Sequence, residues 1–484
     1  MKYIKRFLLF FVLLSCYSSY AQKTNTYPGF YDEINSKIAG DSTSRIYVSA
    51  INITGNKKTK NYIILREVVV KKGDSVVAAR LQSILEESRN LLYNTTLFTE
   101  VDIQPVLTSA YTLVLNVMVK ERWYIFPTPQ FKLIDRNFNE WIKVYNADFN
   151  RVVYGVKFAH YNFSGRGDQL RIYLLNGYAR NYSFSYTAPY SNKALTEGFS
   201  FAAGYTQNRE FPYKTSYNNG LLQFKKNDFE RNTLVIAGAY RLRRGYFKRH
   251  LFSVQYTNVN INDSVITAKY NPNYFNVAKA AIGFVDFTYA FQDSNTDNVN
   301  YPLKGKIISL GATKRGFGFT GGINALTLDA SYRRFFTHTK QYYSAVEVIS
   351  KVKLPFRQAY INQKALGYAD LYLRGLENYV VDGVAAAVAK YTFSKKLVSF
   401  KIPVPFKIKK TTYYIPFSFY GKTFVDGGFS YNRDEFDTRL NNRFLYSGGV
   451  GLDILTLYDF NIRIEYSFNQ LGEKGLFLHT RTNM

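Results

Sequence analysis

One arginine in the sequence has surroundings that predict a buried ionic contact. Arg374 and Gly375 stand among bulky apolar residues in Leu371-Tyr372-Leu373-Arg374-Gly375-Leu376, where a solvated loop would carry mainly polar ones. A guanidinium in such a setting needs an anionic partner, because burying an unpaired charge is costly. Asp426, in Phe424-Val425-Asp426-Gly427-Gly428, is the nearest candidate. We predict that Arg374 and Asp426 form a charge-assisted ion pair.

Side chains that could catalyse a reaction or hold a metal do not cluster in the sequence. The four histidines, His160, His250, His338 and His479, are far apart and lack metal-ligand spacing. Residues 316–321 spell G-x-G-x-x-G, but the segment that follows alternates like a strand, whereas a dinucleotide site requires a helix there. We therefore expect no enzymatic activity, no metal and no cofactor.

The first residues of the chain are typical of a secretory signal. Residues 1–21 have a basic start, a short apolar run and a small-residue cleavage site at Ser19-Tyr20-Ala21. The alternative is a lipoprotein signal that retains Cys16, the only cysteine. If Cys16 leaves with the signal, disulfides and thiolate metal sites are excluded. Residues 22–44 are polar and are predicted to form a flexible leader.

The composition combines a large positive charge with many aromatic residues. The net charge is +28. The chain has 43 Tyr and 40 Phe, and Phe, Tyr and Trp together make up 18% of its residues. Because the basic residues are scattered, the expected anionic partner of an exported chain is the lipid head group, and nucleic acid is not expected. After the signal no apolar run reaches the roughly 18 residues of a membrane-spanning helix. Tyrosine is a residue that lines the rims of membrane barrels.

Residues 45–123 show the pattern of a small α+β domain. An alternating apolar stretch over residues 46–53 ends at the turn pair Gly55-Asn56. Apolar residues then recur at helical spacing over residues 81–92. Two further strands are predicted at residues 98–105 and 112–119, which makes the predicted order β-α-α-β-β.

Five short motifs in this segment resemble a POTRA (polypeptide-transport-associated) domain. They are Ile51-x-Ile53-x-Gly55-Asn56, Arg66-Glu67, Lys72-Gly73-Asp74, Asn94-x-x-Leu97-Phe98 and Glu121-Arg122. Taken singly, Gly55 is predicted to be a turn glycine, and Leu97 and Phe98 are predicted to be core residues. We expect the function to belong to the domain as a whole and not to these single residues, because a small sheet with an exposed edge can accept an extended client segment by strand addition. Which edge is free is not evident from the sequence.

Residues 124–484 consist of short alternating segments separated by turn residues. In residues 252–257, 326–333 and 460–468, apolar residues alternate strictly with polar ones. A soluble one-sided sheet alternates too. Here, however, the polar face carries Asp, Arg and Glu, and no helical segment is present to cover the apolar face. Lipid outside and water inside satisfy both faces, and such a sheet must close on itself.

Counting these segments predicts an all-β transmembrane barrel of about 16 antiparallel strands, with ~10 residues each. The predicted strands are 150–160, 168–178, 179–189, 195–208, 216–225, 232–241, 248–261, 278–292, 306–314, 323–336, 343–354, 384–394, 413–429, 444–454, 460–468 and 475–481. By this count the loop 355–383, which holds Arg374, connects strands eleven and twelve, and Asp426 lies on strand thirteen.

The whole arrangement resembles the BamA/TamA superfamily of outer-membrane assembly proteins and its two-partner secretion relatives. In that superfamily an inward-folded loop carries an Arg-Gly motif that contacts an acidic residue of the barrel wall. Further matching motifs are Asp135-x-Asn137-Phe138-x-x-Trp141, Asn162-x-x-Gly165-Arg166-Gly167 and Gly449-x-Gly451-Leu452. Two features depart from the pattern: Leu376 stands where an aromatic residue is usual, and the chain lacks a terminal aromatic residue.

The resemblance implies a function in handling polypeptides at the outer membrane. The chain would help to insert β-barrel proteins into that membrane, or translocate polypeptides across it, with its POTRA domain in the periplasm. The implied partners are unfolded or nascent outer-membrane or secreted polypeptides, outer-membrane lipids and periplasmic accessory proteins. One alternative is a dedicated two-partner-type secretion pore. A passive porin is a weaker alternative, because a porin needs neither a POTRA domain nor an Arg-Gly loop.

The junction between the first and the last strand is predicted to be weak. The segment 150–160, taken as strand one, alternates well through Val152, Tyr154 and Val156. The last strand is short, with Phe477 among its few apolar residues before a polar tail. Either the polar tail lies outside the hydrocarbon layer, or the seam opens sideways and offers strand one as a template for a client strand.

Overall fold

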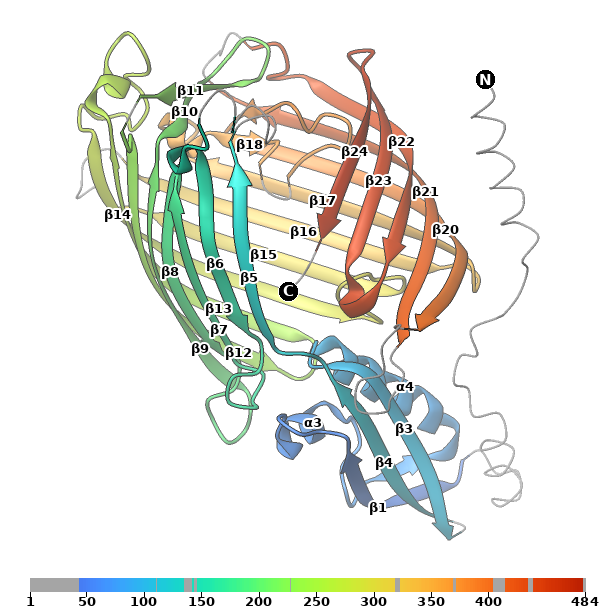
Figure 1. Ribbon diagram of the computed structural model, residues 1–484. Helices are drawn as coiled ribbons and strands as arrows, with labels where there is room; N and C mark the ends of the chain where they lie inside the picture. Colours follow the sequence, from blue (N-terminus) through green and yellow to red (C-terminus); the bar gives the residue numbers. More distant parts are fainter. Residues whose placement is uncertain are drawn as a thin grey trace.

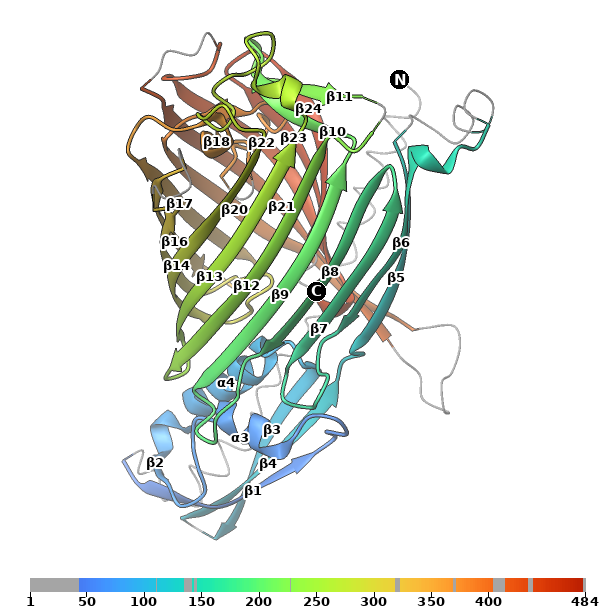
Figure 2. The same ribbon diagram turned by 90° about the vertical axis from the view of Figure 1, so that its left-hand side faces the viewer.

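The computed structural model describes residues 43–109, 111–134, 142, 146–226, 228–317, 323–368, 371–403, 414–433 and 438–481. It consists of a small α+β domain joined to a large, curved antiparallel sheet (Figures 1 and 2). The predicted signal and leader, the motif at residues 135–141 and most of the glycine-rich stretch 316–321 lie outside the described residues. Within the described part of the chain, no helix has the length and apolar character needed to cross a bilayer.

The N-terminal domain is a four-stranded sheet whose apolar face packs against two helices. The strand order is β2-β1-β4-β3, with β1 and β4 parallel and the other pairs antiparallel. Its elements are β1 (Arg45–Thr54), α3 (Asn61–Glu67), β2 (Ser75–Val77), α4 (Ala78–Asn94), β3 (Phe98–Ser109) and β4 (Thr112–Glu121). Alternate residues of β4, such as Leu113 and Leu115, are buried in one core with Leu81 and Leu92 of α4. The predicted order is correct apart from the additional short strand β2.

The second domain is a sheet of sixteen strands, which confirms the predicted all-β fold and strand number. Its strands are β5 (Ile125–Leu133), β6 (Val152–His160), β7 (Gln169–Gly177), β8 (Ala179–Ala188), β9 (Glu197–Asn208), β12 (Arg231–Arg244), β13 (Lys248–Ile261), β14 (Ala281–Thr296), β15 (Gly305–Arg315), β16 (Ala325–Thr337), β17 (Tyr342–Leu354), β20 (Ala385–Pro403), β21 (Tyr414–Tyr431), β22 (Phe444–Leu455), β23 (Asn461–Asn469) and β24 (Lys474–Arg481). Each strand pairs antiparallel with the next one in the sheet.

Alternation along these strands separates an apolar outer face from a polar inner face. On β13 the side chains of Phe252, Val254 and Tyr256 are 48%, 47% and 42% exposed, and they alternate with Ser253 and Gln255. The same alternation of outward and inward side chains leaves large apolar residues exposed on strands all around the barrel. An apolar belt of this kind is stable in lipid and would be an aggregation hazard in water.

One predicted barrel strand is wrong and one barrel strand was not predicted, so the two errors cancel in the count. The first barrel strand is β5, which the sequence pattern does not reveal, because Pro127 and Pro129 lack N–H groups and argue against a central strand. Conversely, the predicted barrel strand at residues 216–225 lies outside the barrel sheet. It overlaps β11 (Leu221–Lys225), which pairs only with β10 (Glu210–Thr215) in a separate hairpin.

The predicted seam residues must therefore be reassigned. Val152, Tyr154 and Val156 lie on β6, which is paired on both sides, with β5 and with β7. Phe477 does lie on the last strand, β24, which pairs with β23. The seam runs between β5 and β24, and within the described residues no ladder joins these two strands. They lie apart in Figure 1 (cyan and dark red).

The end of the barrel away from the N-terminal domain is covered by a structure that we call the cap, consisting of β10, β11 and residues 262–280. Its core is an aromatic cluster that includes Phe211, Phe224 and Tyr274. Remaining short elements are η1 (Phe149–Arg151), η2 (Asp263–Ile266), η3 (Tyr360–Asn362), β18 (Lys364–Leu366), β19 (Val381–Asp382) and η4 (Leu457–Asp459).

Candidate functional site

The long connection between β17 and β20, residues 355–383, folds into the barrel and is called the inward loop. Its short strands β18 and β19 pair with each other and are seen inside the barrel in Figure 1. Leu371, Leu373 and Leu376 are buried in one apolar cluster with Val388 of β20 and Leu445 of β22. Leu376, which stands where the superfamily usually has an aromatic residue, thus packs against the barrel wall.

The structure brings Arg374 and Asp426 together in a bidentate ion pair. Arg374 Nε donates to Asp426 Oδ2 at 2.9 Å, and its Nη2 donates to Oδ1 at 2.5 Å. The backbone N–H of Arg374 also donates to Oδ2, at 3.0 Å. Arg374 is 5% exposed and Asp426 is 1% exposed. Two charges buried this deeply are tolerated only with such geometry.

The rest of the guanidinium is satisfied by the barrel wall. Nη1 donates to the hydroxyl of Thr392 at 2.9 Å, and the guanidinium carbon lies 4.0 Å from the centre of the Phe424 ring. Gly375 follows in a left-handed conformation, with φ of +81°, and a Cβ there would lie 2.7 Å from the Cβ of Ser467. Glycine is therefore required for the loop to approach β23 this closely.

A second ionic cluster, which the sequence motifs do not reveal, lies beside this pair. Lys422 Nζ contacts Asp453 at 2.6 Å and Glu465 at 2.7 Å, and Arg463 Nε lies 3.3 Å from Asp453. The hydroxyl of Tyr301 donates to the second oxygen of Asp453 at 3.0 Å. Strand parity is a signal that could have found these residues, because Lys422 is four positions before Asp426 and hence on the same inner face.

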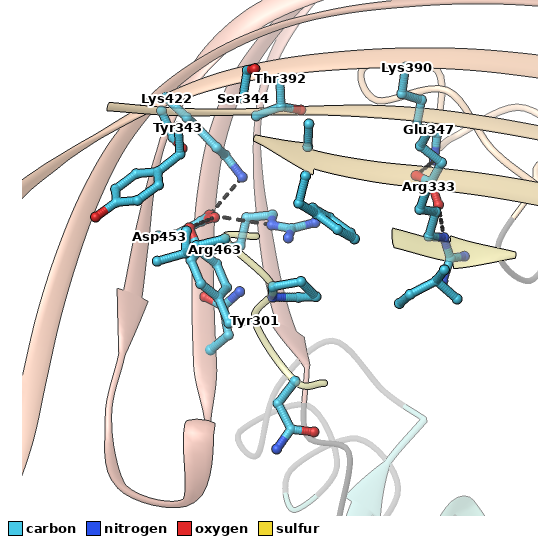
Figure 3. Close-up of a pocket in the computed structure, with 18 of the residues that line it drawn as sticks. Tyr301, Arg333, Tyr343, Ser344, Glu347, Lys390, Thr392, Lys422, Asp453 and Arg463 are labelled. Atoms are coloured by element: carbon cyan, nitrogen blue, oxygen red, sulfur yellow. Dashed lines mark hydrogen bonds and ion pairs between the residues drawn. The ribbon is translucent and has the colours of Figure 1, made fainter. Parts of the chain in front are cut away.

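These groups line a cavity of about 220 Å³ inside the barrel (Figure 3). Its basic lining residues are Arg333, Arg374, Lys390, Lys422 and Arg463, and its acidic lining residues are Glu347 and Asp453. Figure 3 shows Lys422 and Arg463 directed at Asp453, with the Arg333–Glu347 pair at a distance from them. The cavity wall is thus cationic overall, and its charges are held by neighbouring carboxylates.

One group of side chains in the described residues has the spacing of metal ligands. Ligand atoms of Glu377, Glu465 and His479 lie within 4.8 Å of one another. Glu465, however, already neutralises Lys422 at 2.7 Å, and His479 Nε2 lies 3.1 Å from Glu377. We interpret the group as an ion-pair contact that links the inward loop to the last strand β24.

The N-terminal domain is docked on the barrel through the predicted motif at residues 162–167. The backbone N–H of Lys60 donates to the carbonyl of Gly165 at 3.0 Å, and the Asn162 amide donates to the Thr59 hydroxyl at 3.0 Å. Gly165 has φ of +85°, and a Cβ there would lie 2.3 Å from the Lys58 carbonyl oxygen. The motif therefore serves a close backbone contact between the two domains.

A buried ion pair between the domains lies at the base of the barrel. Arg243 of β12 makes two hydrogen bonds to the Glu67 carboxylate of α3, with Nη2 to Oε2 at 2.7 Å. Tyr190, in the turn before β9, donates to Glu67 Oε1 at 3.2 Å. Burial and the nearby Glu67 carboxylate raise the pKa of Tyr190, so its hydroxyl keeps its proton. Arg66 and Glu67 belong to one of the predicted POTRA motifs.

A further contact joins the domain to the opposite part of the barrel base. Asp459 of η4 accepts hydrogen bonds from Tyr93 at 2.9 Å and from Arg122 at 3.1 Å. It also accepts from Asn298 and Asn300, which lie in the turn between β14 and β15. Arg122 is the last residue of the predicted Glu121-Arg122 motif, and burial of its ion pair with Asp459 ties the end of β4 to the barrel.

Contacts across both ends of the barrel close the interior. Asn219, at the tip of the cap hairpin, donates to Val380 of the inward loop and accepts from the backbone of Leu440. The hairpin lies between the fifth and sixth barrel strands, whereas Leu440 lies between the thirteenth and fourteenth. The hairpin therefore crosses the mouth of the barrel. At the other end, the turn that holds Tyr301 reaches inward to Asp453.

The predicted POTRA residues lie in turns and in the core, and not in one exposed site. Gly55 and Gly73 both adopt positive φ, of 89° and 96°, and Asn56 donates to the carbonyl of Thr59 at 2.8 Å. Leu97 and Phe98 are buried in the domain core. These positions shape the domain, and the sheet edges remain as its candidate binding surfaces.

The comparisons with known proteins agree with this geometry. Residues 46–122 match the profile of the POTRA family described as "Surface antigen variable number repeat". No curated protein matches the sequence significantly. Among solved structures, CdiB from Escherichia coli is similar with a TM-score of 0.50 and 11% identity, over 90% of this chain and 75% of that one.

Two further solved structures are similar. BamA from Haemophilus ducreyi, lacking POTRA domains 1–3, has a TM-score of 0.49 and 14% identity, over 97% of this chain and 95% of that one. CdiB from Acinetobacter baumannii has a TM-score of 0.45 and 12% identity, over 90% and 73%.

The class of protein follows from fold and domain match together: a POTRA domain followed by a sixteen-stranded barrel with an inward loop. The family match confirms the POTRA domain predicted from the sequence motifs, and the fold of the chain is similar to that of CdiB.

The Arg374–Asp426 pair yields a first testable prediction. In Arg374→Ala the carboxylate of Asp426 keeps its burial but loses its cation, which should destabilise the barrel by about 3–5 kcal/mol. Chemical unfolding and heat-dependent gel migration measure the change. Arg333→Ala is the matched control, because its pair with Glu347 is about a quarter exposed. Equal stability of the two variants would contradict a structural role of the pair.

The Glu67–Arg243 pair yields a second prediction. Arg243→Ala should leave Glu67 buried without its cation and weaken the docking of the N-terminal domain on the barrel, while the barrel itself stays folded. Spin labels on α4 and on the β8–β9 turn would report a broadened distance distribution. The double variant Glu67→Gln/Arg243→Met removes both charges and should dock better than the single variant. An unchanged distance in Arg243→Ala would refute the docking role.

Proposed function

We propose that this chain is an outer-membrane protein assembly factor that helps to insert β-barrel proteins into the membrane. The observation that carries the proposal is a POTRA domain docked at the base of a barrel whose first and last strands do not pair within the described residues. An ordinary closed barrel has no free edge. An unpaired seam in a bilayer exposes backbone groups that an incoming strand can satisfy.

The closed interior supports a lateral route for the client. The inward loop, held by Arg374, lies inside the barrel, and the cap and the Tyr301 turn cross its two ends. A polypeptide that passed through the lumen would have to displace all three, whereas the seam needs no such rearrangement. The second candidate, a two-partner-type secretion pore, is supported by the fold shared with CdiB and requires ejection of the inward loop. A passive porin is disfavoured by the same obstruction.

The proposed location is the outer membrane, with the POTRA domain in the periplasm. The predicted signal at residues 1–21, the apolar outer face and the superfamily architecture support it. Expected partners are unfolded outer-membrane or secreted polypeptides, outer-membrane lipids and periplasmic accessory proteins. The proposed role is non-enzymatic and uses no cofactor.

Within the POTRA domain, we propose β3 as the edge that receives the client. The two edges of the sheet are β2, with three residues, and β3, with twelve. A strand added to β2 could form only a few ladder hydrogen bonds, whereas β3 is four times as long and lacks a backbone donor only at Pro105. The sequence left the choice of edge open, and the difference in strand length favours β3.

Deletion of residues 45–122 tests the proposed function. The deleted form should retain the heat-dependent migration of a folded barrel, but cells that depend on it should lose folded outer-membrane barrel proteins. The control is Arg243→Ala, which keeps the POTRA domain and weakens only its docking. Normal levels of folded barrel proteins in cells with the deleted form would contradict the proposed assembly function. If barrel proteins stay normal and a secreted protein disappears from the medium, the secretion pore is favoured.

A further inference from the structure

The two strands at the seam differ in the backbone groups that they present. β5 pairs with β6 in an unbroken register, in which Ile125 lies opposite His160 and Leu133 opposite Val152. β24 pairs with β23 in the same way, with Lys474 opposite Phe468 and Arg481 opposite Asn461. In the described residues the opposite edge of each strand has no ladder partner. The N–H and C=O groups on these edges decide which strand can accept another one.

Hydrogen bonds at both ends of β5 identify the residues that point to the seam. Tyr161 N donates to Tyr124 O at 2.9 Å, and Ile134 N donates to Arg151 O at 3.2 Å. In an antiparallel pair, successive residues bond alternately to the partner and away from it. Even-numbered residues from 124 to 134 therefore bond to β6, and the odd-numbered residues from 125 to 133 face the seam.

Two of these five seam-facing residues are prolines. Pro127 and Pro129 have no N–H group to donate, so the middle of the β5 edge offers carbonyl oxygens alone. The carbonyl of Pro129 in turn already accepts from the Gln130 side chain at 3.2 Å. Proline on an edge strand is a known means of blunting that edge against further pairing.

The edge of β24 is complete. Asn469 N donates to Glu473 O at 3.1 Å, so the odd-numbered residues from 473 to 481 bond to β23, and residues 474, 476, 478 and 480 face the seam. None of the four is a proline. Leu476 and Leu478 are 71% and 68% exposed, the highest values among large apolar residues of the described chain, since no neighbouring strand flanks them.

We propose that β24, and not the first barrel strand, is the edge on which a client strand is added. This inference rests on the proposed function and names the site within the seam. In hydrocarbon an unpaired backbone group is costly. A client strand on β5 would leave two of its carbonyl groups facing prolines without a donor, whereas a strand on β24 finds both a donor and an acceptor at every second residue.

The direction of β24 specifies the occupant further. β5 starts at the POTRA end and runs away from it, and β24, as the sixteenth strand of the antiparallel sheet, runs toward the POTRA end. An antiparallel client strand on β24 therefore starts at the POTRA end and carries outward apolar residues beside Leu476 and Leu478. A second copy of this chain in the same membrane could offer its own β24, which would pair parallel and less stably, or its own β5, whose edge lacks two donors at Pro127 and Pro129.

Disulfide trapping on the full-length protein in liposomes tests the assignment. Cys16→Ser removes the native cysteine, and single cysteines are placed by Leu478→Cys on β24 or Phe131→Cys on β5. The probe is a synthetic ten-residue peptide of alternating valine and threonine with one central cysteine. We expect about tenfold more peptide disulfide on β24, since two hydrogen bonds of ordinary net strength account for a difference of that size.

Restoring the missing donors provides a second, independent readout. Pro127→Ala/Pro129→Ala in the Phe131→Cys background should raise the peptide disulfide on β5 toward the β24 value. Thr128→Ala is the matched control, because residue 128 bonds to β6, and it should change nothing. Heat-dependent gel migration verifies that each variant is folded.

Several outcomes would overturn the proposal. Equal or greater trapping on β5, or a proline variant that behaves like Thr128→Ala, would remove the assigned difference between the edges. Chain-to-chain disulfides through Leu478→Cys that exceed the peptide disulfides would assign the edge to a second copy. Absence of trapping on both strands would refute strand addition at the seam, while the POTRA deletion decides the assembly function separately.

Discussion

The structure depends on one constraint: in a hydrocarbon layer every backbone N–H and C=O group must be paired within the protein. The strands from β6 to β23 obey it by pairing on both sides. β5 and β24 have a ladder on one side only among the described residues. A sheet of this size therefore contains a single discontinuity, and the POTRA domain is joined to it directly, because β4 leads into β5 across three residues.

The inward loop is connected to the same discontinuity. Glu377 of the loop lies 3.1 Å from His479 of β24, and the Arg374 guanidinium lies 3.9 Å from Glu465 of β23. The loop thus holds the last two strands from the inside, while their outer faces meet lipid. Displacement of the loop away from β24 would break this partly exposed contact between Glu377 and His479.

A series of buried and partly buried polar contacts leads from the inward loop to the POTRA domain. The cluster around Lys422 and Asp453 includes Tyr301, whose turn also contains Asn298 and Asn300. These asparagines bond to Asp459, which bonds in turn to Arg122 of the POTRA domain. Such contiguous networks are a physical route for coupling, although coupling itself is measured only by perturbing both ends. A network of ionic groups also fixes one arrangement of the loop, since each buried charge requires its particular partner.

The sequence by itself determined the architecture, because the signals for it are local. Period-two alternation identified fifteen of the sixteen barrel strands, and the loop with Arg374 was placed between the correct strands. The identity of the seam was decided by tertiary structure. A strand with two prolines, β5, fails the local pattern for a strand, and it can exist only because its proline positions face an edge that has no ladder partner to lose. Strand parity indicates that Lys422 faces inward, but its meeting with Asp453 and Glu465 was decided by the register of the sheet, since the three residues lie on three strands.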